Sequence, residues 1–428
     1  MRLELAGYPV QDIRFGSRTT LGGGVLIIDR SELRALLTED PVFADVDVDL
    51  ARPGERVRIV HLLDTVEPRL KVSGPGSDFP GFLSPAVSVG EGRTNRLPGV
   101  AVMQTAVLPQ TLGGLNVKDA IVDMAGPLAA LSPFSRTLNV VLRFTVREGF
   151  TYTEYDAAIR RAGLRAAVYL AETTRGLPPG GAETFELGPA GRGLPRVAYV
   201  CLLHQEGEVH HVFVYGRVVD ETPTLLHPNE FFDGGVVCGS HHMGADRTPT
   251  WVYQNHPVVG ELYRRHGRDL VFAGVVITKC LSSAFFDKQR SASYAAKLTR
   301  LLGADGVVIT GGCAGHGIAD LMLNCQQAER QGLRTALTCF EMAGDRGNEF
   351  GFVTFVPEAD AVVSTGNMDE VVEFPEMDRV IGGEEIIDIG SYEGDGGSPA
   401  VGPFKAALRR LYAASSMGGA GRMTARPA

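Results

Sequence analysis

The chain has 428 residues, 44% of them hydrophobic and 21% charged, which is the composition of a globular protein and excludes a largely disordered or fibrous chain. Its 41 Lys and Arg against 50 Asp and Glu give a formal net charge of -9 without a basic cluster, so nucleic acid is not an expected partner. The start of the chain lacks a signal-peptide pattern, and no window approaches 18 uninterrupted apolar residues. We therefore expect no membrane span and a cytoplasmic protein with reduced thiols, because its six cysteines form no CxxC pair.

The first 150 residues predict a β-rich structure, with short alternating runs at Arg56 to Val60 and Pro68 to Val72 between turn signals. A helix is expected over 153–174, where apolar residues recur at steps of three and four before Gly176. The predicted domains are a β-rich amino-terminal domain at 1–175, a linker at 176–194, a Rossmann-like α/β domain at 195–414 and a flexible tail at 415–428.

After residue 195, short apolar runs alternate with amphipathic helices. Strands are expected at 197–203, 271–277, 305–310, 334–339 and 361–364, and helices at 287–302 and 319–331. This alternation predicts an α/β fold with a doubly wound, mostly parallel sheet and helices on both of its faces.

Ligands of such sheets bind beyond the carboxyl ends of the strands, so candidate site residues are expected in the loops there. Cys280 follows one strand, and Cys313 and His316 lie in the glycine-rich stretch Gly311 to Gly317 after the next. A glycine-rich loop at a helix start either binds an anion or is a tight turn, and neither nucleotide-binding motif is matched, so a bound nucleotide is not expected and no cofactor is certain. Lys279, His316 or a helix amino end would stabilise a thiolate, so Cys280 and Cys313 are expected to cluster and to react before the cysteines in apolar runs: Cys201, Cys325 and Cys339.

The densest polar constellation is DGGVVCGSHHMGAD, residues 233–246. It holds potential nucleophiles and bases in Cys238, Ser240, His241, His242 and Asp246. Adjacent histidines seldom bind one metal ion together, and no spaced second pair lies nearby, so no metal site is expected. A non-metal functional loop and a solvated turn both remain open interpretations.

Long stretches of the chain carry a family likeness, among them QDIRFGSRTTLGGGVLIID, VEPRLKVSGPGSDFPGF, NHPVVGELYRRHGRDLVFAGVVIT and DKQRSASYAAKLTRLLGADGVVIT. They resemble the proprotein subunit of component B of glycine, sarcosine and betaine reductases. The resemblance implies a subunit that works beside a selenocysteine-containing partner in reductive cleavage of an amine from the α carbon of a glycine derivative. It also implies, for the glycine-specific members, self-cleavage before a cysteine that becomes a pyruvoyl group, whose carbonyl forms a Schiff base with the substrate amine.

This chain departs from the family pattern at the precursor cysteine. The family segment Ser-Ala-Cys-Asp-Lys aligns with residues 243–247, which places Ala245 at the cysteine, and Gly311 and Gly312 replace a family Glu-Glu pair. A pyruvoyl group is expected only if Cys238 is processed instead. The residues expected to form the site are Cys238, His241, His242, Asp246, Cys280, Cys313 and His316.

The sequence thus predicts a subunit of a component B-like complex that acts on a small amino acid or amine with a selenocysteine- or cysteine-containing partner subunit and without a pyruvoyl group. Two alternatives stay open. One is a non-catalytic scaffold subunit, and the other is a relative that uses Cys280 or Cys313 in different C-N, C-S or C-Se chemistry. A homo-oligomer is compatible with each of them.

Overall fold

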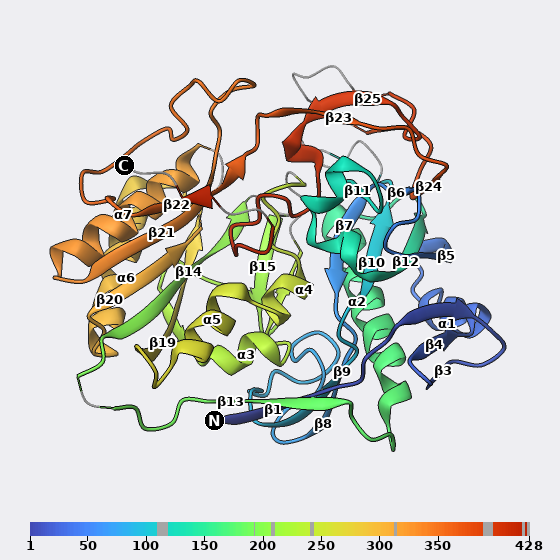
Figure 1. Cartoon of the computed structure of the whole chain (residues 1–428), viewed down its shortest axis with the longest axis horizontal. Helices are drawn as coiled ribbons and strands as arrows, with labels where there is room; N and C mark the ends of the chain where they lie inside the picture. The colour runs from blue at the N-terminus through green and yellow to red at the C-terminus, as the bar shows by residue number, and fades with distance from the viewer. Residues whose placement is uncertain are drawn as a thin grey trace.

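The computed structural model describes residues 1–108, 119–191, 193–206, 210–239, 244–311, 315–387, 397–421 and 424–425. Several mixed sheets and seven α-helices within these ranges make a mixed α/β fold, which confirms the predicted fold class. Figure 1 shows the amino-terminal sheets on the right and below, and the later strands and helices on the left. The doubly wound arrangement and the domain boundaries stay predictions.

Three sheets and one short helix form most of the amino-terminal part. The first sheet has the order β5-β12-β10-β7, made of Phe43–Ala51, Leu138–Val146, Val100–Ala106 and Leu62–Val66. The second has the order β13-β1-β9-β8, made of Gly181–Glu186, Arg2–Gly7, Gly92–Arg96 and Arg69–Ser73. The third has the order β2-β4-β3, made of Asp12–Phe15, Val25–Ile28 and Thr20–Gly22, and is followed by helix α1, Arg30–Leu37. Strand β13 lies within the range that was expected to be a linker.

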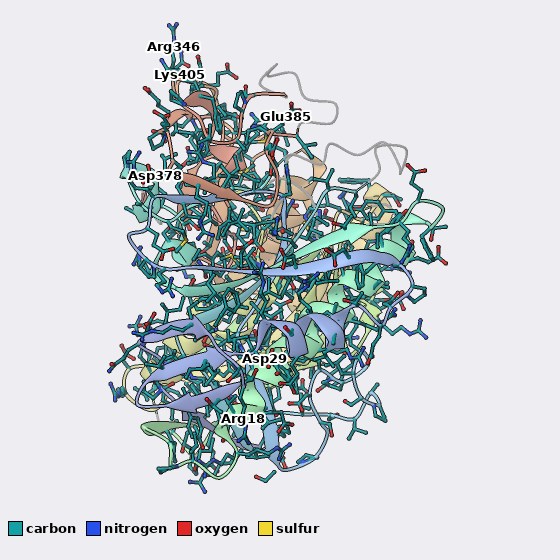
Figure 2. All side chains as sticks on the ribbon, turned by 90° about the vertical axis from the view of Figure 1, so that its right-hand side faces the viewer. Arg18, Asp29, Arg346, Asp378, Glu385 and Lys405 are labelled. Carbon is teal, nitrogen blue, oxygen red and sulfur yellow. The ribbon has the colours of Figure 1, made fainter. Side chains whose placement is uncertain are left out.

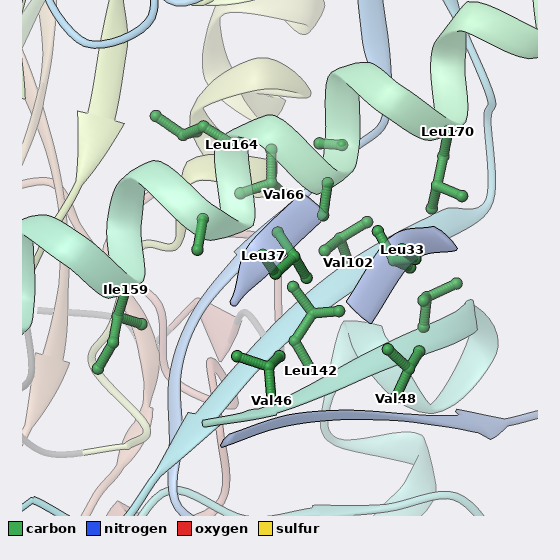
Figure 3. Close-up of a cluster of buried hydrophobic side chains, with 14 of the residues drawn as sticks. Leu33, Leu37, Val46, Val48, Val66, Val102, Leu142, Ile159, Leu164 and Leu170 are labelled. Carbon is green, nitrogen blue, oxygen red and sulfur yellow. The ribbon is translucent and has the colours of Figure 1, made fainter. Parts of the chain in front are cut away.

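The long helix α2, Tyr152–Ala171, confirms the helix expected at 153–174. It begins at a capping box, in which the Thr151 hydroxyl accepts from the Glu154 N-H and the Glu154 carboxylate accepts from the Thr151 N-H. Its apolar stripe packs on the first sheet, where Leu164 and Leu170 meet Val66 and Val102 in the largest core cluster (Figure 3). Burial of this stripe holds α2 against β7, the strand that carries part of the site described below.

The later part of the chain contains a five-stranded parallel sheet of order β19-β14-β20-β21-β22. Its strands are Val271–Cys280, Arg196–Glu206, Gly306–Thr310, Arg334–Glu341 and Val362–Asn367, at the positions expected from the apolar runs. Antiparallel β17, Thr224–Leu226, and β26, Thr424–Ala425, pair at its two edges. The ribbon of β15, β16 and β18, which are His210–Val214, Arg217–Val218 and Val236–Cys238, extends from β14.

Alternate residues of β14 enter different core clusters, because successive side chains of a strand point to opposite faces. Val200 and Leu202 pack with α6, Phe285–Leu301, and α7, His316–Arg330, the two helices expected at 287–302 and 319–331. Tyr199 and Leu203 pack with α3, Pro228–Phe232, α4, Thr250–Gln254, and α5, Pro257–Arg265.

The last part of the chain returns to the amino-terminal sheets (Figure 1). Strand β24, Arg379–Ile381, pairs with β6, Val57–Ile59, which also pairs with β11, Val122–Asp123, and β23, Val371–Phe374, pairs with β25, Phe404–Ala407. The fully buried Arg58 and Asp123 form an ion pair under this region, with 2.6 Å between Arg58 Nε and Asp123 Oδ1. Ser415 and Ser416, at the start of the range expected to be a tail, are also fully buried.

Short 3-10 helices occur at Pro127–Ala130, Pro133–Arg136, Glu172–Thr174 and Leu408–Arg410. Charged side chains such as Arg346 and Lys405 project at the periphery (Figure 2). In the part of the chain that the structure describes, no helix has the length and apolar character needed to cross a bilayer.

Candidate active site

A small cavity lies where β14 and β18 end. Its volume is about 10 Å³, which is room for about one water molecule. The side chains that line it are all buried: His204, Val212, Cys238, Asp246, Arg247, Thr248, Tyr253 and Met417. The cavity therefore brings Cys238 and Asp246, two of the residues expected from the sequence, together with side chains from other parts of the chain. These are His204 of β14, Tyr253 of α4 and Met417 near the carboxyl terminus.

Cys238 is held by a hydrogen-bond chain that begins on β7. Thr250 donates to the Asp64 carboxylate from both its N-H, at 2.9 Å, and its hydroxyl, at 2.6 Å. The Thr250 oxygen in turn accepts the N-H of Cys238 at 2.9 Å. Because α4 packs against both β7 and β18, this chain connects the amino-terminal sheet to the wall of the cavity.

Arg160 is a buried cation beside the same wall. Its guanidinium lies over the Phe213 ring at 4.1 Å and the Phe82 ring at 5.5 Å, and it forms an ion pair with Asp156 one helical turn away. Gly239 leaves the room that this guanidinium occupies, since a Cβ there would lie 2.5 Å from Arg160 Nη2. The residue after Cys238 is therefore restricted to glycine by a cation from α2.

Arg247 brings a second guanidinium to the cavity. Its Nη1 donates to the carbonyl oxygens of Leu62 and, at 3.4 Å, Leu63, and the guanidinium lies 5.8 Å from the centre of the Tyr412 ring. The Tyr412 hydroxyl accepts from Thr65 at 3.3 Å. Strand β7 and the carboxy-terminal segment thus position Arg247 together.

Burial changes the ionisation of the groups around the cavity. It raises the pKa of Asp64 to about 6, against the opposing effects of the Thr250 hydrogen bonds and the Arg160 charge. Burial also lowers the pKa of Arg160 to about 10 and raises that of Tyr152. A carboxyl that changes its charge close to neutral pH is a feature of functional sites.

Cys280 lies in a separate, fully buried cluster at the same end of the sheet. Its Sγ is 3.9 Å from the Gly317 carbonyl oxygen, so the end of β19 lies beside the start of α7, the helix that follows β20. Lys279 forms an ion pair with Glu221 at 2.6 Å, and Lys288 forms one with Asp320 at 2.6 Å. Cys280 is fully buried and Lys279 is paired with Glu221, so neither exposure nor an unpaired Lys279 supports an early reaction of Cys280. The order in which the thiols react stays a prediction.

The remaining expected site residues are placed only in part. His241, His242 and Cys313 lie outside the described residues, as does Ser240, and His316 is described only as the first residue of α7. Burial raises the pKa values of Cys201 and Cys325 to about 11 and that of Cys339 to about 12, as expected for thiols in apolar packing. Within the described ranges, no three His, Cys, Asp or Glu side chains come together as a metal-binding group.

Sequence reasoning missed His204, Asp64, Arg160 and Arg247. His204 carries a signal in the sequence, because it lies near the carboxyl end of the apolar run that forms β14, opposite Cys280 in the strand register. Asp64 also carried a signal, as a single charge inside the apolar run of β7. The two arginines carried none, since arginine on a helix or in a loop is ordinarily solvated.

Comparison with known proteins assigns the chain to a family. The family of glycine/sarcosine/betaine reductase component B subunits matches residues 1–426. The chain belongs to this family. The resemblance found in the sequence is thereby confirmed.

Its curated relatives match over their full lengths. The chain is 36% identical to the glycine reductase complex component B subunits alpha and beta of Acetoanaerobium sticklandii, with 100% of each chain covered. It is also 36% identical to the sarcosine reductase complex component B subunit alpha of Peptoclostridium acidaminophilum, with 100% of each covered. The betaine reductase subunit alpha of the latter organism is 32% identical over 90% of this chain and 89% of its own. No solved structure matches the chain.

The surroundings of Ala245 do not fit the pyruvoyl group that the family resemblance implies. The Ala245 side chain is a methyl group and is fully buried. Its N-H donates to the Arg409 carbonyl, and the preceding carbonyl, that of Gly244, accepts from the Ala413 N-H, both at 2.9 Å. This position therefore offers neither a nucleophile for backbone cleavage nor a backbone free to rearrange.

Proposed function

We propose that the chain is a component B subunit that binds a small amino acid for reductive C-N cleavage by a partner subunit with a reactive selenocysteine or cysteine, and that it carries no pyruvoyl group. The observation that carries this proposal is the pair Asp246 and Arg247, which are both buried in the wall of one small cavity. A carboxylate beside a guanidinium is complementary to the ammonium and carboxylate groups of an amino acid.

The chemistry needs no carbonyl group if the substrate nitrogen stays cationic. The partner's selenolate or thiolate attacks the α carbon, and the electron pair of the C-N bond leaves with the nitrogen as a neutral amine. The new bond joins the partner's selenium or sulfur to the carboxymethyl group. Asp246 favours the ammonium form that this displacement requires, and Arg247 orients the carboxylate.

The position of the cavity supports the proposal. Starting from β14, the chain adds β19 on one side and then β20, β21 and β22 on the other. We propose that this is a doubly wound sheet, in which ligands bind outside the carboxyl ends of the strands at the point where the strand order reverses. His204, which lines the cavity, lies at that end of β14.

The cavity holds about one water molecule, so an amino acid enters only if a lining side chain moves. Met417 is the lining residue suited to this, because its unbranched side chain adopts several conformations at low cost. A small cavity with a movable wall favours the smallest amino acids and their N-methylated forms.

Calorimetric titration of the purified full-length chain tests the proposal. Glycine, sarcosine and betaine are the probes, and acetate and methylamine each lack one of the two charged groups. We expect at least one of the three amino acids to bind and both fragments to bind more than tenfold more weakly. Arg247→Lys should weaken binding about tenfold or more, because the forked guanidinium is lost. The matched control, Arg264→Lys on the exposed face of α5, should leave binding unchanged.

Failure of all three amino acids to bind would overturn the proposed substrate class and favour the scaffold alternative. Equal binding of acetate and sarcosine would instead exclude the ammonium contact at Asp246.

A further inference from the structure

We infer that Asp64 takes up a proton from solution when the site binds the carboxylate of its substrate, so that substrate binding is proton-linked. This inference rests on the proposed function, because it requires an anionic group at the cavity. It adds a role for Asp64 on β7, which is linked through Thr250 to Cys238 in the cavity wall.

The first support is the connection between Asp64 and the cavity. Asp64 is only 3% exposed, and both of its carboxylate oxygens accept from Thr250, at 2.9 Å and 2.6 Å. Thr250 accepts from the N-H of Cys238, which lines the cavity. Water therefore screens Asp64 poorly, and a charge that enters the cavity acts on it through protein rather than through solvent.

The second support is the set of charged groups that face Asp64. From α2 it is Arg160 that stabilises the Asp64 carboxylate, and Arg160 also forms an ion pair with Asp156. Tyr253 of α4 and Tyr412 of the carboxy-terminal segment also interact electrostatically with Asp64, and both phenols remain neutral because burial raises their pKa values. Cys238 of β18 interacts electrostatically with Arg160. Arg160 thus stabilises ionised Asp64 while it is also shared with Asp156.

A substrate carboxylate at the cavity adds a further negative charge to this group. It attracts Arg160, which lowers the stabilisation of ionised Asp64, and like charges nearby disfavour the ionised form of a carboxyl. Because the pKa of Asp64 is about 6 before the ligand arrives, a modest further increase carries it through neutral pH. One proton from solution then joins Asp64, and the total charge of the buried group stays the same.

Calorimetry in buffers of different ionisation enthalpy measures this proton directly. We titrate sarcosine or glycine, whichever binds, into the full-length chain at about pH 7, and we expect uptake of roughly half a proton per ligand or more. Affinity should fall severalfold when the pH rises from about 7 to about 8, because the proton then becomes harder to acquire.

Asp64→Asn keeps the side-chain volume and one acceptor oxygen for Thr250 but removes the titration. It should bind at least as tightly as the wild type at about pH 7, with no proton uptake. The matched control is Asp78→Asn, whose carboxyl also has a pKa raised by burial but lies beside β8 in the other four-stranded sheet. It should keep the proton uptake of the wild type.

The outcomes separate this inference from the proposed function. Amino acid binding without proton uptake by the wild type, or uptake that persists in Asp64→Asn, overturns the inference and leaves the proposed function standing. Absence of any amino acid binding overturns the proposed function and the inference with it. The wild-type measurement decides the matter even if the Asn variant does not fold.

Discussion

Single residues of the site are constrained by neighbours that are distant in the chain. Asp64 and Thr250 are 186 residues apart, and Gly239, which follows β18, leaves the room that Arg160 of helix α2 occupies. The hydrogen bonds from Thr250 make the burial of the Asp64 carboxyl tolerable. Substitutions here should therefore act on stability as well as on binding.

Gly239→Ala is the sharpest test of the packing around Arg160. The added methyl group would lie 2.5 Å from Arg160 Nη2 and 2.8 Å from Phe213 Cε2, and Arg160 is enclosed by two rings and an ion pair. We expect a loss of about 1–3 kcal/mol in the free energy of unfolding, measured by urea denaturation. Gly260→Ala, in α5 with open space around it, is the control and should gain about 0.5–1 kcal/mol. Equal stabilities for the two variants would contradict the described position of Arg160.

Asp64 should also make the stability of the protein depend on pH. Its folded-state pKa of about 6 lies above the ordinary value of 3.8, so the folded protein binds the proton more tightly than the unfolded chain. The contribution to stability is fully present below about pH 4 and is lost as the pH rises through about 6, by about 3 kcal/mol in total. Asp64→Asn should lack this loss.

Urea denaturation of both proteins at about pH 4 and about pH 8 measures the difference. The stability of Asp64→Asn relative to the wild type should rise with pH, since other carboxyls contribute equally to both proteins. A relative stability that falls with pH would show that Asp64 is stabilised as the carboxylate.

At the scale of elements, local sequence patterns locate the helices and strands, but they do not predict which elements pair or pack with one another. The spacing of apolar residues and Gly176 located α2, and the apolar runs located the five parallel strands. The same signals cannot pair β6 with β24, because those strands are short and more than 300 residues apart. The fold class was therefore predictable, whereas the site depends on pairings such as β7 with α4 that no local pattern encodes.

Thr151→Ala tests the capping box that starts α2. The hydroxyl that accepts the Glu154 N-H is lost, so the free energy of unfolding should fall by about 1 kcal/mol. Thr153→Ala, two residues later on the exposed side of the helix, should instead gain a few tenths of a kcal/mol (~0.5) from the higher helix propensity of alanine. Thermal denaturation of the two variants side by side should give midpoints on opposite sides of the wild type, and a drop for both would refute the cap.

For the whole molecule, we expect one uncleaved chain of 45.8 kDa. Backbone cleavage of the kind that the family resemblance implies begins with attack by a cysteine thiol on the preceding carbonyl, and the methyl group of Ala245 cannot make that attack. Cys238 is the competing position, and its N-H is already bonded to Thr250 at 2.9 Å. Intact-mass measurement should give a single species, also for Cys238→Ser. Two fragments, residues 1–237 and 238–428 with a blocked amino end on the second, would restore the pyruvoyl mechanism.

The return of the carboxy-terminal segment sets the order in which a newly made chain can become functional. Met417 closes the cavity that Cys238 and Arg247 begin, and β24 completes the small sheet that β6 and β11 begin. At about 5–20 residues per second, the ribosome needs on the order of tens of seconds between β6 and these last pieces. During that time the late partners of β6 and Arg58 are missing, and a chain truncated before residue 417 lacks the side chain that closes the cavity.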